Sequence, residues 1–196
     1  MRRGGVSVEH FLKIPRDRIG ALIGPGGRVK REMEKRTGIR VDVESETGEV
    51  TIHYDSARDP ALVLKVNDLV KAVGRGFSPQ RAMRLLKDDQ FFAVIDIQDY
   101  VGKKVDHVRR MRARVIGTGG KTRRVIEELS EAELSVYGDT VAIIGDPVSL
   151  DIARTAVDMI LNGSEHSAVY SYLEHTRRER RLAELRPPED RVKEEE

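Results

Sequence analysis

The chain of 196 residues has no cysteine and no tryptophan, and only 5% of its residues are aromatic. The absence of cysteine excludes disulfides, thiolate catalysis and cysteine-based zinc sites. No stretch approaches the roughly 20 apolar residues that a membrane-spanning helix needs. Arg2 and Arg3 lie near the N-terminus, but no apolar run of the secretory type follows them. We therefore expect a soluble, cytoplasmic protein that uses neither a metal nor another cofactor.

Charged residues make up 35% of the chain, and together with the absence of cysteine this composition favours a thermophilic source. The net charge is only +2, but the basic residues are unevenly distributed. Residues 102–124 contain nine Lys or Arg against one acid, and residues 13–36 contain eight against three. This clustering is the electrostatic pattern expected of a protein that binds nucleic acid.

A glycine-rich motif of eight residues occurs twice, once in each basic stretch. Its first copy is GPGGRVKR at residues 24–31, and its second is GTGGKTRR at residues 117–124. Glycines let the backbone approach a ligand closely, and the first turn of a following helix offers unpaired N–H groups to an anion. The basic residues after the glycines add charge where phosphates would lie. Two such turns in one small protein predict a linear polyanion as the ligand.

The repeat extends to a unit of strand, helix, glycine turn, helix, strand, strand and helix. An Asp-Pro pair, which is typical of a helix start, precedes the last helix of each copy at residues 59–60 and 146–147. The sequence thus predicts two domains, a helical linker, a C-terminal helix and a disordered tail. Their expected ranges are 6–76 and 91–163 for the domains, 77–90 for the linker, 164–186 for the helix and 187–196 for the tail.

The first copy resembles the KH-domain signature. The residues that carry the resemblance are Ile14-Pro15, the stretch 19–27 with its GxxG loop, and Thr37-Gly38-Ile39. Residues 117–120 and their flanks resemble a second, divergent KH module, which has ten more residues between its first strand and its loop. The element order is that of the type I module. The resemblance implies an α+β fold of two tandem KH domains, each a three-stranded antiparallel sheet with three helices on one face.

Two KH modules followed by a basic C-terminal helix resemble the archaeal ribosome-assembly factors whose eukaryotic counterpart is called partner of Nob. This resemblance implies a non-catalytic protein that binds small-subunit ribosomal RNA near its 3′ end and assists maturation by a separate endonuclease. Regulation of messenger RNA and an accessory role in the exosome are alternatives within the RNA-binding class. A protein-binding scaffold built from degenerate KH folds is a third alternative.

In KH modules the GxxG loop holds about four nucleotides of a single strand, with the bases against an apolar groove. The RNA-binding residues expected in the second domain are Arg110, Arg112, Arg114, Ile116, Gly117, Thr118, Gly119, Gly120, Lys121, Arg123 and Arg124. Those expected in the first are Gly24, Pro25, Gly26, Gly27, Arg28, Lys30 and Arg31. The side chains expected to line the two grooves are Ile19, Leu22, Ile23 and Val41, and Val115, Ile116 and Val136.

The two domains differ in charge beside the groove. The first has three acids, Glu44, Glu46 and Glu49, in its hairpin loop, and Pro25 lacks a backbone donor. The second has only Asp139 in a short hairpin loop. We therefore expect the second domain to be the main RNA contact. The first is then free to dock a protein partner, such as an rRNA-processing endonuclease or another ribosome-assembly or translation protein.

A phosphate-handling enzyme is the strongest rival interpretation, because residues 120–122 read Gly-Lys-Thr like the end of a P-loop. A P-loop also needs a glycine five positions before its last one, where this chain has Val115. The segment before the loop, residues 109–114, is basic rather than a buried apolar strand. The five histidines are scattered and predict no metal or acid–base site. We therefore expect no enzymatic activity.

Overall fold

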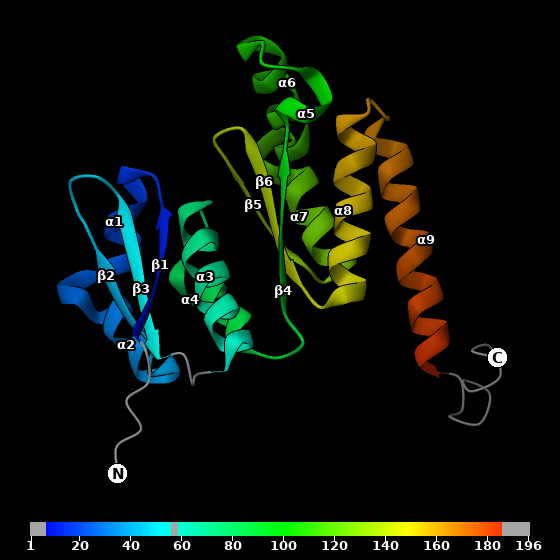
Figure 1. Ribbon diagram of the computed structural model, residues 1–196. Coiled ribbons are helices and arrows are strands. Elements are labelled where there is room, and N and C mark those ends of the chain that lie inside the picture. The colour runs from blue at the N-terminus through cyan, green and yellow to red at the C-terminus, as the bar shows by residue number, and fades with distance from the viewer. Residues whose placement is uncertain (1–6, 56–58, 186–196) are drawn as a thin grey trace.

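The computed structural model describes residues 7–55 and 59–185, which form two modules of the same topology (Figure 1). The first module consists of β1 (Ser7–Lys13), α1 (Arg16–Ile23), the 3₁₀ turn η1 (Pro25–Gly27), α2 (Arg28–Thr37), β2 (Arg40–Val43), β3 (Glu49–Asp55) and α3 (Pro60–Gly74). The linker contains α4 (Pro79–Ala82) and the 3₁₀ turn η2 (Met83–Leu86). The second module consists of β4 (Phe91–Asp96), α5 (Gln98–Val101), α6 (Val105–Ile116), the 3₁₀ turn η3 (Thr118–Gly120), α7 (Lys121–Ser130), β5 (Glu133–Tyr137), β6 (Thr140–Gly145) and α8 (Pro147–Leu161). The last helix, α9, spans His166–Leu185.

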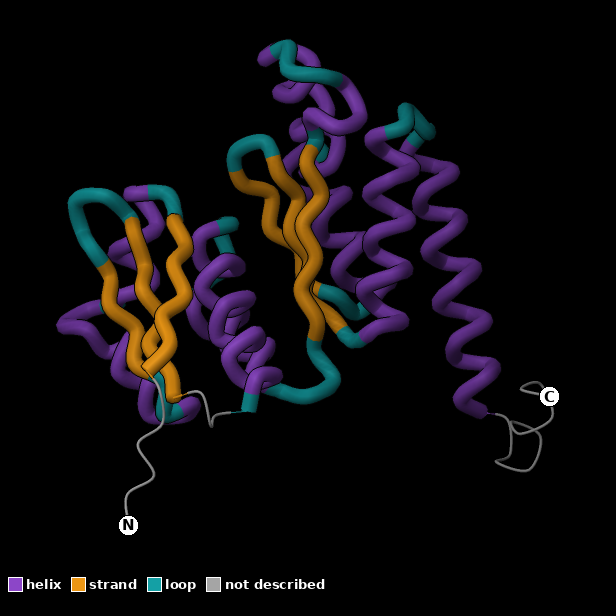
Figure 2. The backbone as a smooth tube through the Cα atoms, in the orientation of Figure 1, coloured by secondary structure: helices purple, strands orange, loops and turns teal. Residues whose placement is uncertain are grey.

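The predicted α+β fold is confirmed. Each module has a three-stranded antiparallel sheet, in the orders β1-β3-β2 and β4-β6-β5, with helices packed against it (Figure 2). The C-terminal helix α9 packs on α7 and α8 of the second module. The tail expected at residues 187–196 lies outside the described residues, as does Val6 of the expected first strand.

The two modules also share equivalent hydrogen bonds at positions outside the glycine-rich motif. Near the end of α2, the hydroxyl of Thr37 donates to the Met33 carbonyl and accepts from the Ile39 N–H. At the end of α7, the hydroxyl of Ser130 makes the same two bonds, to the carbonyl of Ile126 and from the N–H of Ala132. The N–H of the next edge strand also donates to a glutamate in both modules, in the pairs Val41–Glu34 (2.9 Å) and Leu134–Glu127 (2.8 Å).

The ten additional residues of the second module form α5, an extension of the helix before the loop and a longer connection between the strand and that helix. This helix, α6, has 12 residues, whereas α1 has 8. The side chain of Tyr100 in α5 donates a hydrogen bond of 2.5 Å to Asp158 in α8. That hydrogen bond and burial raise the pKa of Tyr100 to about 12. The insertion is therefore fastened to α8 of its own module.

The outer face of the second sheet is covered by the first module. All residues of β6 are buried, whereas buried and partly exposed residues alternate along β3. On one face of β6, Ala142 and Ile144 join the apolar cluster of the first module, which includes Phe77 and Leu85. Figure 1 shows α3 and α4 between the two sheets. The modules therefore share one continuous layer of packed side chains.

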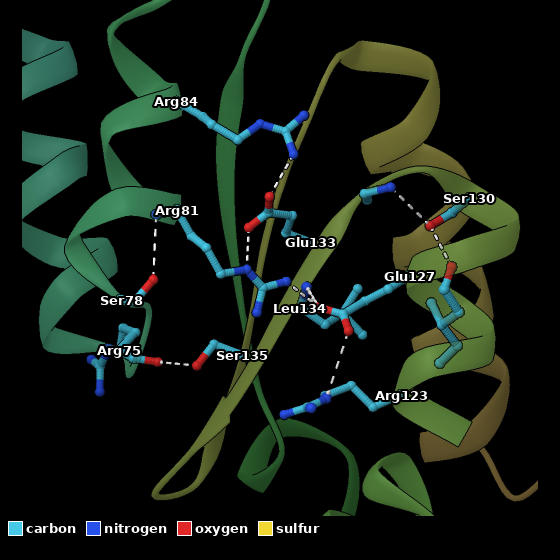
Figure 3. A network of polar contacts seen from close by, with 12 residues as sticks. Arg75, Ser78, Arg81, Arg84, Arg123, Glu127, Ser130, Glu133, Leu134 and Ser135 are labelled. Carbon is cyan, nitrogen blue, oxygen red and sulfur yellow. Dashed lines mark hydrogen bonds and ion pairs between the residues drawn. The ribbon is translucent and has the colours of Figure 1, made fainter. Parts of the chain in front are cut away.

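Polar contacts around Arg81 fix this packing (Figure 3). Arg81 donates to Glu127 of α7 and Glu133 of β5, and Arg84 also bonds Glu133. Burial opposes the charge of Arg81, but the hydrogen bonds to the two glutamates raise its pKa above the ordinary value. Farther along β5, the hydroxyl of Ser135 donates to the Arg75 carbonyl at 2.8 Å. The linker is thus attached to the second module at several points.

Glu131 is the one non-glycine residue with positive φ (64°) in the described part of the chain, and Gly38 takes its place in the first module with φ 65°. The left-handed conformation costs a residue with a Cβ roughly 1–2 kcal/mol. We expect Glu131→Gly to raise the free energy of unfolding by about 1 kcal/mol in urea denaturation. The loss of the Glu131–Arg180 ion pair (3.4 Å) offsets little of this gain, because exposed pairs contribute little.

The matched control is Gly38→Ala, which introduces the same strain into the first module. We expect it to lower the free energy of unfolding by about 1 kcal/mol. A destabilised Glu131→Gly protein would contradict the assignment of backbone strain to this position.

Candidate nucleic-acid interface

The two glycine loops have almost the same backbone conformation. The φ values are 71°, 58° and 75° at Gly24, Gly26 and Gly27, and 71°, 58° and 77° at the corresponding Gly117, Gly119 and Gly120. Positive φ at three of four positions favours glycine strongly over any other residue. The repeated sequence motif therefore encodes one repeated loop geometry.

The first glycine of each loop is also required by packing. A Cβ on Gly24 would lie 2.4 Å from the side chain of Val29, and one on Gly117 would lie 2.2 Å from Thr122 Oγ1. By contrast, a Cβ on Gly26 or Gly119 would meet nothing within 4 Å. The first glycine lets the next helix pack against the loop, whereas the third position is open to a ligand.

The helices that follow the loops begin without a side-chain cap. Gly27 precedes α2 and Gly120 precedes α7, and neither can supply a capping oxygen from a side chain. The backbone N–H groups of a first helical turn lack intrahelical partners and carry the positive end of the helix dipole. Both loops are at the surface, with Pro25 and Thr118 exposed, so an anion can reach these helix starts.

The basic residues around the second loop fall into two groups. Arg110 and Lys121 are exposed, and within residues 7–55 and 59–185 neither forms an ion pair. Arg112 donates to the Gly138 carbonyl in the β5–β6 turn (3.1 Å), and Arg124 donates to the Gly119 carbonyl (3.0 Å). The second bond fixes the loop itself. Arg123 forms a loose ion pair with Glu127 at 3.7 Å.

Arg114 has a different place from the one expected. Its guanidinium donates to the carbonyls of Ile160 (3.2 Å) and Ser164 (2.6 Å), at the end of α8 and in the turn before α9. The Ile160 carbonyl also accepts from the N–H of Gly163, so Arg114 strengthens a turn that the backbone already forms. Arg114 therefore ties α6 to the C-terminal part of the module.

The cations of the first loop are partly neutralised. Lys30 lies 3.6 Å from Glu34 and 3.7 Å from Asp42, and Arg40 also pairs with Asp42. Burial would raise the pKa of Asp42, but Arg40, Lys30 and His53 together lower it below the ordinary value. Asp42 is thus ionised and reduces the positive charge of Lys30, which lies in the first turn of the helix after the first loop. Arg28 and Arg31 are exposed.

Only some of the predicted groove residues reach the surface. Ile23, Ile116 and Val136 are partly exposed and can contact a base. The prediction was wrong for four others, because Ile19, Leu22, Val41 and Val115 are at most 6% exposed and belong to the apolar cores. An apolar pattern identifies the face of an element that points to the core. It does not show which residues of that face reach the surface at the edge of the core.

Two residues near the second loop were not predicted. The hydroxyl of Tyr170 in α9 lies 2.9 Å from Thr122 Oγ1, and His166 Nε2 lies 2.9 Å from the Arg114 carbonyl. The histidines were expected at scattered positions, and neither His166 nor Tyr170 was expected at a binding site. Their spacing of four residues was a signal that they share one face of that helix.

These loops, helix starts and partly exposed apolar side chains define two KH modules. Residues 9–58 match the family model described as KH domain. Residues 91–178 match the model of the second KH domain of PNO1, described as eukaryotic type KH-domain (KH-domain type I).

The chain is 46% identical over 172 residues to a KH domain-containing protein of Methanocaldococcus jannaschii, covering 87% of this chain and 74% of that one. It is 27% identical over 174 residues to the pre-rRNA-processing protein pno1 of Schizosaccharomyces pombe, covering 88% and 72%. Dim2p of Pyrococcus horikoshii, crystallised with a/eIF2alpha and rRNA, is 46% identical with a TM-score of 0.82, covering 88% of this chain and 96% of that one. The chain therefore belongs to the family of tandem KH-domain proteins that resemble PNO1 and Dim2p.

Replacing the two exposed inner residues of each loop by aspartate tests the difference between the loops. We expect Thr118→Asp with Gly119→Asp to weaken binding of single-stranded RNA by about tenfold or more, because two negative charges then face the phosphates. We expect Pro25→Asp with Gly26→Asp to weaken it by less than about threefold, since Asp42 already limits phosphate binding there. Fluorescence anisotropy titrations with one RNA measure both effects. The reverse ranking would refute the assignment of the main contact to the second module.

Proposed function

We propose that the protein binds single-stranded RNA during assembly of the small ribosomal subunit, near the 3′ end of the ribosomal RNA, and that its second module makes the main contact. One observation carries this proposal. The second loop is exposed and surrounded by cations, whereas the equivalent first loop has Asp42 beside it. The names of the relatives support the setting, because they include pre-rRNA-processing proteins and a Dim2p crystallised with rRNA.

In this proposal the second module binds the RNA strand and does not alter it chemically. The sugar–phosphate backbone lies over Gly117–Gly120, where the start of α7 and Lys121 attract phosphates. The bases lie against Ile116 and Val136, while Arg124 keeps the loop in its conformation through the Gly119 carbonyl. Affinity therefore comes from a preformed loop rather than from ordering on binding.

The protein acts, in this proposal, as a binding factor and not as an enzyme. Across residues 7–55 and 59–185, histidine and acidic side chains nowhere form a group of three that could hold a metal ion. Cleavage of the RNA would be the task of a separate endonuclease, and this protein would hold the substrate for it.

The first module is proposed to bind a protein. Its β2–β3 loop carries Glu44 and Glu46, and Glu49 is the first residue of β3; this acidic surface suits a basic protein partner better than RNA. The partner would be an rRNA-processing endonuclease or another ribosome-assembly or translation protein. The crystallised Dim2p of Pyrococcus horikoshii is in a complex with a/eIF2alpha, which supports a translation factor.

We propose that the protein binds RNA in the cytoplasm. None of the helices in the described ranges has the length and apolar character to span a bilayer.

RNA binding by the second loop predicts a steep dependence on salt. Each phosphate neutralised on a single strand contributes about −0.7 to the slope of log K against log salt concentration, so four phosphates give about −3. Anisotropy titrations at several salt concentrations measure this slope. We expect Lys121→Ala to make the slope shallower by about 0.7, and Lys87→Ala, an exposed change in the linker, to leave it unchanged. A slope near zero would favour a pure protein-binding scaffold.

A further inference from the structure

A cavity of about 450 Å³ lies beside the second glycine loop, on the side away from the groove. Its walls come from α6, the loop, the start of α7 and the first half of α9. Arg110 and Arg114 line it from α6, whereas Arg112 and Ile116 of the same helix are outside it. With 3.6 residues per turn these two pairs lie on different faces of α6. The groove and the cavity therefore lie on different faces of α6.

The cavity is positively charged. Arg110, Arg114 and Lys121 line it, and no acidic side chain is among its lining residues. Arg114 bonds only to carbonyls, which do not neutralise its charge. Because Arg110 and Lys121 are exposed, the site is open to an anionic ligand from solvent.

Two rings of α9 form one wall of the cavity. His166 and Tyr170 have their ring centroids 6.1 Å apart and their planes inclined at 43°. Both rings are held in place, Tyr170 by its hydroxyl contact with Thr122 and His166 by its contact with the Arg114 carbonyl. Fixed aromatic rings beside cations are the combination that binds single-stranded nucleic acid, through base stacking and phosphate neutralisation. The volume is in the range of sites for small ligands, about 300–1,000 Å³.

Neither of the comparable places in the molecule has this combination. A larger cavity of about 650 Å³ between the modules is lined by Lys13, Lys71 and Arg75 but by no aromatic ring. In the first module, Asp17 and Ala21 occupy the positions that correspond to Arg110 and Arg114. The carboxylate of Asp17 accepts a hydrogen bond from Tyr137 of the second module. The charged, ring-lined cavity therefore belongs to the second loop.

We propose that this cavity binds a nucleotide of the RNA strand adjacent to the segment held in the groove. Its base stacks on Tyr170 beside His166, and its phosphate lies between Arg110 and Lys121. The inference rests on the proposed function, because the strand must pass over the second loop to reach the cavity. The RNA then contacts the loop from both sides, and the second module binds more nucleotides than the groove alone can hold.

The test compares a tetranucleotide, which the groove alone accommodates, with an octanucleotide that extends beyond it at either end. Anisotropy titrations use the full chain and the variant Tyr170→Leu, which removes the stacking ring. We expect this variant to bind the octanucleotide about tenfold more weakly than the unaltered protein does, and the tetranucleotide equally well. Tyr170→Phe keeps the ring but loses the hydroxyl contact with Thr122, so it should bind the octanucleotide more tightly than Tyr170→Leu and the tetranucleotide equally well. His175→Ala, on the same helix but outside the cavity, is the matched control.

An equal change at both lengths, or no change at either, would overturn the nucleotide subsite while leaving RNA binding by the groove intact. Failure of the unaltered protein to bind either RNA would instead overturn the proposed function. Should Tyr170→Leu not fold, photocrosslinking of the unaltered protein to an octanucleotide containing 4-thiouridine replaces it. The peptide with His166 and Tyr170 must then carry a nucleotide, and crosslinks restricted to the groove residues would overturn the subsite.

Discussion

The burial of β6 on both faces is the constraint on which the arrangement of the molecule depends. Val141 and Ile143 belong to the apolar cluster of their own module, while Ala142 and Ile144 belong to the cluster formed by the first module and the linker. Fully burying a side chain such as isoleucine contributes about 1.5–3 kcal/mol, so an uncovered β6 would be costly in water. The second sheet is complete only when the first module lies on it. The two glycine loops are therefore held in a fixed spatial relation.

Within this arrangement the two glycine loops differ in the side chains around them and not in their backbone conformation. The same loop geometry occurs twice, but the position of Asp42 in the first module corresponds to Ser135 in the second. Ser135 donates to the Arg75 carbonyl at the junction of the modules, whereas Asp42 pairs with Lys30 and Arg40 beside the loop. The same position of the repeat therefore has two roles. In the second module Ser135 attaches the modules to each other, and in the first Asp42 reduces the positive charge near the loop.

The sequence was sufficient to predict the two modules, their element order and the position of both loops, because these depend on local patterns. Glycine spacing, Asp-Pro helix starts and alternating strands are all contained in short segments. The role of Arg114 could not be predicted, since its carbonyl partners lie about 50 residues away, as the separations of 46 and 50 show. The burial of Leu22 and the contact of Tyr170 with the second loop likewise depend on how helices pack. The packing of the modules on each other could have been predicted from one feature of the sequence. Strand β6 (TVAIIG) is almost continuously apolar, as expected of a strand buried on both faces, whereas apolar and polar residues alternate in β3 (EVTIHYD).

Glu34 and Glu127, which occupy equivalent positions in the two modules, affect the tendency of the protein to aggregate in concentrated solution. Strands β2 and β5 are the outer strands of their sheets beside the two loops, and exposed outer strands can pair with another molecule and aggregate. Each glutamate accepts a hydrogen bond from a backbone N–H, that of Val41 or Leu134, which is then not available for pairing with another strand. The carboxylates also place negative charge along these borders. Two sheet borders that stay accessible to ligands are thereby protected against self-association.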